Sequence, residues 1–294
     1  MEEKILEEIR RFVATSLGNR HEETGLIHFS EPLVGYASWD DPLFKEYKNS
    51  IGEFHLTPRE IFAATLDDNK VVVGTVICWV LPISEIARQS NRLQEQWPGR
   101  EWALTRYFGE EFNCELRRHM VEYLTGLGYQ AVAPTLSGVF QCFSDTPVGI
   151  ASNWSERHAA YAAGLGTFSM NDAFISEAGM AMRLGSVITD LNLLPTLRKE
   201  QDYRANCLNC NACISRCPVG AITMSGHDKI KCRNYLFCEE SVQLAEKYGG
   251  KRTSGCGLCQ TRVPCEFKNP RGKTKQDNVL PRDDGNGQEK WERI

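Results

Sequence analysis

The sequence predicts an α/β fold followed by a small cysteine-rich module. Segments with helical and with strand periodicity alternate through the first 200 of the 294 residues, whereas nine of the twelve cysteines lie between residues 207 and 265. Alternating helices and strands pack in layers around one core, and a chain of this length can form one large domain plus a module. We therefore expect an α/β domain over 1–200, a cysteine module over 201–267 and a charged, poorly ordered tail over 268–294.

The elements of the first domain follow from the spacing of apolar residues. Ile5, Ile9 and Val13 recur at helical spacing with charges opposite them, and the stretch 71–81 is a nearly continuous run typical of a strand buried on both faces. Gly126 and Gly164 are helix stop signals. Helices are expected over 2–17, 101–125 and 155–166, and strands over 71–81, 130–136 and 183–193.

Composition narrows the class of protein. The net charge of −4 gives no sign of a strongly basic surface for nucleic acid. The N-terminus is charged and amphipathic, without the features of a signal peptide or a twin-arginine signal. The longest apolar run, residues 71–83, is too short to span a bilayer and contains Gly74 and Pro82. We expect a cytoplasmic protein with reduced thiols and no membrane span.

Four cysteines form the run C-x2-C-x2-C-x3-C-P, namely Cys207, Cys210, Cys213 and Cys217 followed by Pro218. Bacterial two-cluster proteins use this run, and its fourth cysteine ligates the other [4Fe–4S] cluster. The short spacers wrap a tight loop around three corners of a cubane, and the loop's free N–H groups offset the negative charge. One such run therefore requires four further ligands elsewhere in the chain.

Those further ligands are Cys232, Cys256, Cys259 and Cys265, with Cys238 left over. We assign Cys207, Cys210, Cys213 and Cys265 to one cluster, and Cys217, Cys232, Cys256 and Cys259 to the other. Zinc is an alternative because it also takes four-cysteine sites with C-x2-C spacing. A single cluster with spare cysteines is another. A bare two-cluster carrier needs far fewer residues, so we expect the clusters to feed electrons into the first domain.

The motifs resemble a known family. The segment WSERHAAYAAGLGTFSMNDAFISEAGMAMRLGSVITDL over 154–191, the four-cysteine run, C-x-x-Y-L from Cys232 and a later C-x2-C resemble the epoxyqueuosine reductases and the related reductive dehalogenases. The resemblance covers roughly residues 140–265. It implies a nitroreductase-like mixed sheet flanked by helices with a ferredoxin-like module behind it. It further implies a base-off corrinoid (cobalamin) that receives electrons from the clusters and drives reductive deoxygenation or dehalogenation.

The resemblance also implies roles for individual residues. Asp145 in FSDTP matches the aspartate of the family's D-T-G-P motif, a general acid that protonates the departing oxygen, although the glycine after the threonine is missing here. An alternative interpretation of Asp145 is a turn residue before Pro147. For Gly164 and Gly166, which also match the family, the alternative is a helix C-cap. The residues matching the corrinoid pocket are Gly164, Gly166, Ser169, Met180, Leu184 and Tyr235.

Departures from the family motifs leave several functions open. The last cysteines follow C-x2-C-x5-C instead of C-x2-C-x3-C-P, which makes Cys265 the less certain ligand. The first hypothesis is a reductase acting on a tRNA nucleoside or a small molecule, supplied by a low-potential donor of the ferredoxin or flavodoxin type. The second is an electron-transfer protein that reduces another protein's corrinoid and has no substrate of its own. A third is a protein that reduces cobalamin and passes it on.

Overall fold

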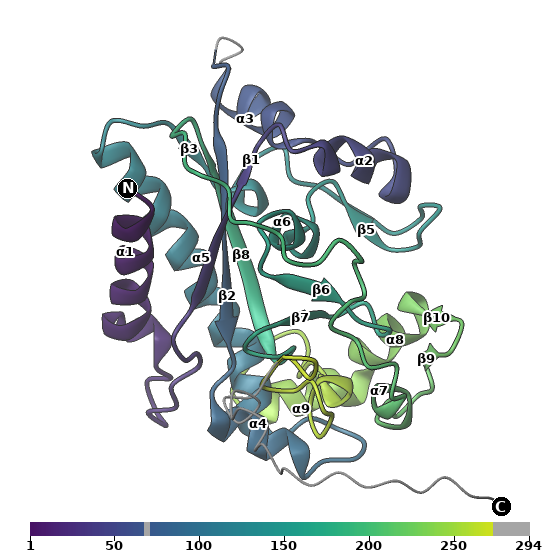
Figure 1. Ribbon diagram of the computed structural model, residues 1–294. Helices are drawn as coiled ribbons and strands as arrows, with labels where there is room; N and C mark the ends of the chain where they lie inside the picture. The colour runs from purple at the N-terminus through teal and green to yellow at the C-terminus, as the bar shows by residue number, and fades with distance from the viewer. Residues whose placement is uncertain (68–70, 273–294) are drawn as a thin grey trace, which may run out of the picture.

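A four-stranded sheet lies at the centre of the protein (Figure 1). The structure, a computed structural model, describes residues 1–67 and 71–272. All three strand pairings are antiparallel, so the mixed sheet expected from the resemblance is not observed among these strands. In spatial order the strands are β1 (Leu33–Ser38), β2 (Thr75–Pro82), β8 (Met182–Thr189) and β3 (Ala131–Val132).

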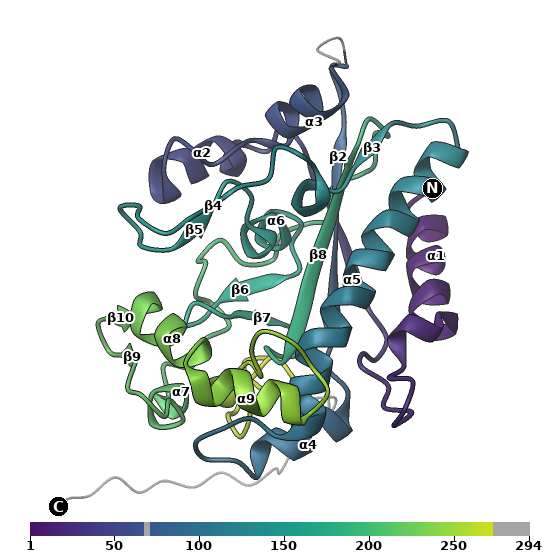
Figure 2. The same cartoon turned by 180° about the vertical axis from the view of Figure 1, so that it is seen from behind.

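Helices cover both faces of this sheet (Figures 1 and 2). Successive side chains of a strand point to opposite faces, so Ile77 and Trp79 pack into one apolar cluster while Val76 and Cys78 pack into the other. Both faces of this strand are therefore buried, as the nearly continuous apolar run over 71–81 predicts. The helices of the first face are α1 (Glu2–Thr15) and α5 (Arg100–Gly126); those of the second are α2 (Pro42–Ile51), α3 (Pro58–Leu66) and α6 (Glu156–Ala162).

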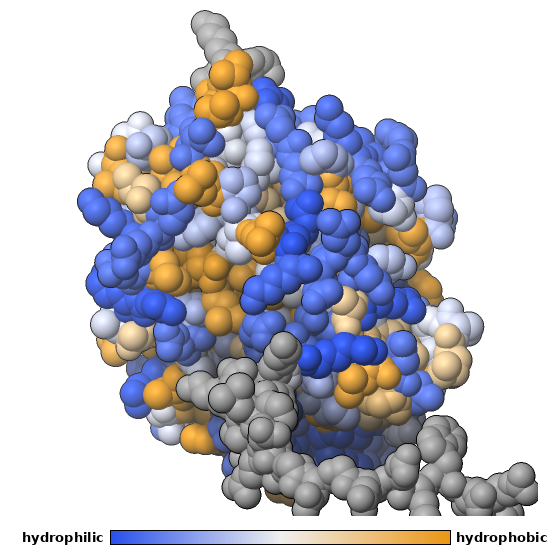
Figure 3. Space-filling model, viewed as in Figure 1, coloured by the Kyte–Doolittle hydropathy of each residue, from blue (hydrophilic) through white to orange (hydrophobic). Residues whose placement is uncertain are grey.

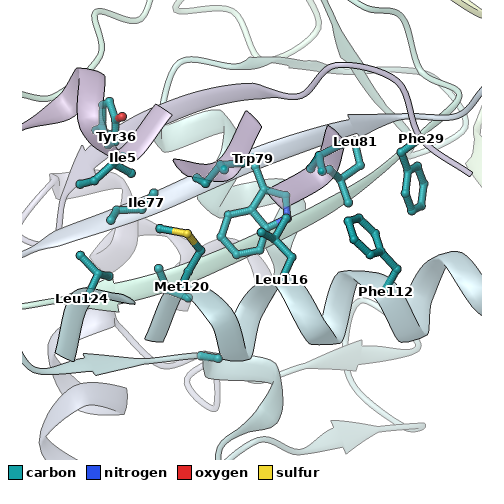
Figure 4. Packing of buried hydrophobic residues seen from close by; sticks show 14 of the residues in the cluster. Ile5, Phe29, Tyr36, Ile77, Trp79, Leu81, Phe112, Leu116, Met120 and Leu124 are labelled. Atoms are coloured by element: carbon teal, nitrogen blue, oxygen red, sulfur yellow. The ribbon is translucent and has the colours of Figure 1, made fainter. Parts of the chain in front are cut away.

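The long helix α5 forms most of the first layer. Figure 4 shows its apolar side chains facing Trp79 and Ile77 of the sheet. Trp79 is fully buried, and its indole N–H donates to Asn113 Oδ1 of α5 at 2.9 Å, which satisfies the one polar atom of the side chain. The apolar residues that α5 contributes recur at helical spacing: Phe112, Leu116, Met120 and Leu124.

The predicted helices and two of the predicted strands are confirmed within a few residues. The exception is the strand expected over 130–136, which shortens to Ala131–Val132 and continues as the 3-10 turn Pro134–Leu136. Proline has no N–H for a sheet ladder, and this explains where the strand stops. The tail prediction over 268–294 falls mostly on residues 273–294, which lie outside the described residues.

The cysteine-rich segment lies at the lower end of the sheet, beside α4 (Glu85–Arg92) in Figure 2. It holds short elements connected by loops, and the chain between 254 and 266 returns to pack on α4 and α5. Its elements are α7 (Ala212–Ser215), β9 (Ile222–Thr223), β10 (Gly226–His227), α8 (Lys229–Leu236), α9 (Glu239–Lys247) and the 3-10 turn Leu258–Gln260.

One face of the molecule, drawn in Figure 3, is mainly polar. Figure 3 shows hydrophilic side chains spread over the face seen in Figure 1, with hydrophobic residues scattered among them. Among the described residues, no helix combines the length and the apolar character that a membrane crossing requires.

Candidate functional site

The first predicted set of cysteines surrounds one small cavity. Cys207, Cys210, Cys213 and Cys265 all line a space of about 20 Å³ between the cysteine loop and the segment around Met180. The backbone N–H of Met180 donates to the Cys265 carbonyl at 2.8 Å and to the Glu266 carbonyl at 3.1 Å, so Cys265 is held against the first domain. Cys207 and Cys265, which are 58 positions apart in the sequence, thus line the same cavity, as the ligand assignment requires.

The second predicted set surrounds a separate and larger cavity. Cys217, Cys232, Cys256 and Cys259 line a space of about 230 Å³. They come from the loop after α7, from α8 and from the chain around the last 3-10 turn. Cys238, the cysteine left without a role, lines neither cavity, and its thiol lies 3.2 Å from the Tyr235 carbonyl, to which it donates.

Arg216 ties the cysteine loops together and to α4. Its side chain is buried, and its guanidinium donates at 3.2 Å to the carbonyls of both Leu258 and Thr261. The same group donates at 2.7 Å to the Gln94 carbonyl and at 3.3 Å to the Asn91 carbonyl. Because Arg216 directly precedes Cys217, these bonds set the position of that thiol relative to Cys256 and Cys259.

Two glycines let the last cysteine loop approach α5 closely. A Cβ on Gly257 would come within 2.1 Å of the Trp102 ring, and one on Gly255 within 2.9 Å of the Arg106 side chain. Both glycines have positive φ angles, +62° and +68°, which larger side chains adopt at a cost. The positions around Cys256 therefore require glycine for both space and backbone conformation.

The chemistry of the donor set fits iron–sulfur clusters. Burial, with a smaller contribution from neighbouring cysteines, raises the pKa of Cys256 to about 11 and that of Cys265 to about 12. Thiols grouped in this way ionise readily only beside positive charge, which cluster iron supplies. Among the residues that the structure describes, no three histidine, cysteine or carboxylate side chains converge closely enough to hold a single metal ion. The cysteines instead surround the two cavities.

The glycines predicted to line a corrinoid have structural roles. Gly164 ends α6 with φ of +70°, and its N–H donates to the Tyr161 carbonyl at 3.0 Å. This is the helix C-cap that was the alternative reading. A Cβ on Gly166 would lie 2.2 Å from the Ile175 carbonyl, because β6 (Gly166–Phe168) and β7 (Phe174–Ser176) pair there.

The other residues predicted to contact the corrinoid lie in three different parts of the structure. Ser169 and Met180 line the first cysteine cavity, whereas Tyr235 lines the second and stacks on Trp97 with ring centroids 4.5 Å apart. The carbonyl of Leu184 accepts a hydrogen bond from Asn113 at 2.9 Å inside the first domain. The predicted set therefore does not form one surface for a macrocycle.

Asp145 lies in the turn between β4 (Cys142–Phe143) and β5 (Ala151–Ser152), where it is exposed and lines neither cavity. The expectation of a buried acid is not met at this position. The hairpin does contact the cysteine segment, since Lys229 Nζ donates to the Val148 carbonyl at 2.9 Å. The role of Asp145 as a general acid stays a prediction.

Comparison with known proteins supports the sequence motifs. The chain is 27% identical over 271 residues to the epoxyqueuosine reductase of Francisella cf. novicida, an alignment that covers 86% of this chain and 68% of that protein. It is 34% identical over 115 residues to the epoxyqueuosine reductase of Bacillus anthracis, covering 37% of this chain and 29% of that one. The chain resembles the epoxyqueuosine reductases. The family resemblance predicted from the motifs is thus confirmed, although no family model matches the chain.

Solved structures related to this epoxyqueuosine reductase-like chain are more distant. The epoxyqueuosine reductase of Bacillus subtilis has a TM-score of 0.46 at 17% identity, over 90% of this chain and 65% of that one. A catabolic reductive dehalogenase has a TM-score of 0.48 at 17% identity, over 66% of this chain and 26% of that one. The chain spans about two thirds or less of the length of these relatives.

Sequence reasoning missed three arginines of the second cavity. Arg106 of α5, Arg157 of α6 and Arg183 of β8 line it from the side of the first domain, opposite the cysteine segment. No spacing rule connects them, because they come from three elements that meet only in the folded protein. Burial and the nearby Arg106 lower the pKa of Arg183 to about 9, while Glu110 opposes this shift.

Proposed function

We propose that this protein is an iron–sulfur oxidoreductase of the epoxyqueuosine reductase type, in which two [4Fe–4S] clusters carry electrons to a substrate beside the second cluster. One observation carries the proposal: two sets of four cysteines, each drawn from distant segments, line two separate cavities. Four cysteines per cubane is the usual ligation of such clusters. A low-potential donor of the ferredoxin or flavodoxin type would supply the electrons.

The proposed reaction is the reductive removal of an oxygen atom from the substrate. Release of that oxygen as water takes two electrons and two protons, and two clusters, when bound, store one electron each. The chain's own part is to hold eight thiolates in place, through Arg216 for the second set and through the Met180–Cys265 backbone contact for the first. The relatives are named for epoxyqueuosine, so an epoxide-bearing nucleoside is the substrate class that we propose.

A redox titration followed by electron paramagnetic resonance tests this proposal. Anaerobically purified protein is expected to hold iron and to show two one-electron reductions, because the two cysteine sets are separate. Zinc in place of iron, or a single reduction in protein with its full iron content, would contradict the proposal.

The corrinoid that the resemblance implies does not fit the residues predicted for it. Gly164 and Gly166 serve a helix cap and a hairpin, and Ser169 and Tyr235 line different cavities. We therefore propose no step through a corrinoid.

Addition of cobalamin to the anaerobic protein checks this disagreement. We expect the visible spectrum to remain that of free cobalamin, because the predicted lining residues do not share one surface. Appearance of a base-off species would contradict the geometry and restore the corrinoid reductase of the sequence prediction. Heat-denatured protein is the control for spectral changes caused by free iron or thiols.

A second candidate function is electron transfer to another protein without a substrate of its own. It is favoured by the position of Asp145, which is exposed and is not among the residues that line either cavity. In this case the clusters would be reoxidised by a protein partner. Reoxidation of the reduced clusters by a small substrate alone would rule this candidate out.

A further inference from the structure

The two cysteine cavities differ in size and charge although their donor sets are the same. The first measures about 20 Å³, and its lining contains no lysine, arginine or histidine. The second measures about 230 Å³, and its lining contains Arg106, Arg157, Arg183 and His227 but no aspartate or glutamate. The first cavity serves as an internal control, because four cysteines line it without any cationic side chain.

The arginines have few partners that would neutralise them. The Nε atom of Arg183 is buried without a hydrogen-bond partner, and Glu110 Oε2 lies 3.8 Å from it. Glu110 is shared with Arg117, to which it is closer at 3.1 Å. Arg157 donates to the backbone carbonyl of Asp172, and the carboxylate of Asp172 lies near Arg157 but is shared with His227 Nδ1 at 3.4 Å. Positive charge therefore gathers on one wall of the cavity.

We propose that the second cavity binds a small molecule bearing an oxyanion, a carboxylate or a phosphate, through Arg106, Arg157 and Arg183. A guanidinium presents donors in a planar fork that matches both oxyanions, and such charge-assisted bonds are about twice as strong as neutral ones. This inference rests on the proposed function in one respect, that a cluster occupies the cysteine side of the same cavity.

The rest of the lining indicates how such a ligand would be oriented. Trp102 and Tyr235 offer aromatic surface, and Asn171 and Gln260 offer amide groups. The anionic end would face the arginines of the first domain, which leaves the remainder of the molecule toward Cys232 and Cys256. An acceptor held in this way would lie directly against the second cluster. Within the proposed class of epoxide-bearing nucleosides, this assigns the substrate to members that carry a phosphate or a carboxylate.

Calorimetric titration of the iron-loaded protein tests the proposal, with inorganic phosphate and acetate as separate probes under anaerobic conditions at low salt. We expect one probe to bind with unit stoichiometry, and its identity tells phosphate from carboxylate ligands. Arg183→Gln should weaken that binding about tenfold or more, the effect of losing a charge-assisted bond of at least 1.4 kcal/mol. Arg118→Gln is the matched control, since Arg118 lies exposed on α5 outside the cavity lining.

Iron analysis of each variant separates this inference from the proposed function. Full iron with no binding of either probe overturns the anion site and leaves the cluster proposal intact, and so does equal weakening by Arg118→Gln. If Arg183→Gln loses iron, Arg106→Gln repeats the test from a different element. Loss of iron in both variants would show that the arginines serve the cluster itself, and would also overturn the inference.

Discussion

Replacing Cys232 with serine is expected to lower the iron content from about eight to about four atoms per chain, whereas Cys238→Ser leaves about eight. Cys232 lines the second cavity with Cys217, Cys256 and Cys259. Cys238 lines neither cavity, and its thiol donates to the Tyr235 carbonyl at 3.2 Å. The two cysteines lie six residues apart and are both half-buried. The two variants therefore differ mainly in whether the replaced thiol lines the second cavity.

Iron analysis and electron paramagnetic resonance of the anaerobically purified variants check this expectation. The Cys232→Ser protein should keep the signal of the first cluster, because Cys207, Cys210, Cys213 and Cys265 line a different cavity. If Cys238→Ser were the variant that loses iron, the ligand assignment would be reversed. Equal iron contents in both variants would remove Cys232 from the ligand set.

Replacing Glu266 with alanine is expected to lower the free energy of unfolding by about 3 kcal/mol, the cost of leaving a buried charge pair broken. Glu266 is 2% exposed and accepts hydrogen bonds from Arg92 Nε at 2.8 and 2.9 Å. It also accepts from Arg88 Nη1 at 3.3 Å and from the backbone N–H of Arg262 at 2.8 Å. Its loss would leave a void beside Cys265 and unpair the backbone N–H of Arg262, while Arg88 and Arg92 would still face Glu85, which is exposed.

Glu85→Ala is the matched control, because Glu85 pairs with the same two arginines but is 47% exposed. An exposed pair contributes less than about 1 kcal/mol, so this variant should unfold close to the wild type. Denaturant unfolding under anaerobic conditions, followed by circular dichroism and cluster absorbance, measures both. We also expect Glu266→Ala to lose iron from the first site. Equal midpoints for the two variants would show that Glu266 does not anchor the Cys265 loop.

Local patterns in the sequence predicted the elements whose apolar residues follow a regular helix or strand spacing. The run that became β2 is apolar on both faces because helices cover both sides of its sheet. Helix α5 ends at Gly126, within a residue of its expected limit, because glycine is a strong stop signal. The strand expected over 130–136 is longer than the observed β3. Pro134 has no N–H to continue the hydrogen-bond ladder with β8, and that pairing is known only from the folded chain.

The candidate site was predictable only in part. The grouping of eight cysteines into two sets follows from spacing and from the number of thiolates that a cubane needs. The residues around the clusters do not follow from spacing. Gly164 looked like a ligand-facing glycine, yet its φ of +70° serves the end of α6. Asp145 looked like a buried acid, yet its hairpin leaves it exposed.

Three features could be predicted from the sequence: helices and strands in the first 200 residues, a double set of cluster-type cysteines after them, and a resemblance to the epoxyqueuosine reductases. Each of these features is local or depends on short motifs. Which surfaces meet depends on the folded chain. Arg106, Arg157 and Arg183 become neighbours because α5, α6 and β8 converge on the loop of Cys256, and the charge of a cavity depends on that convergence.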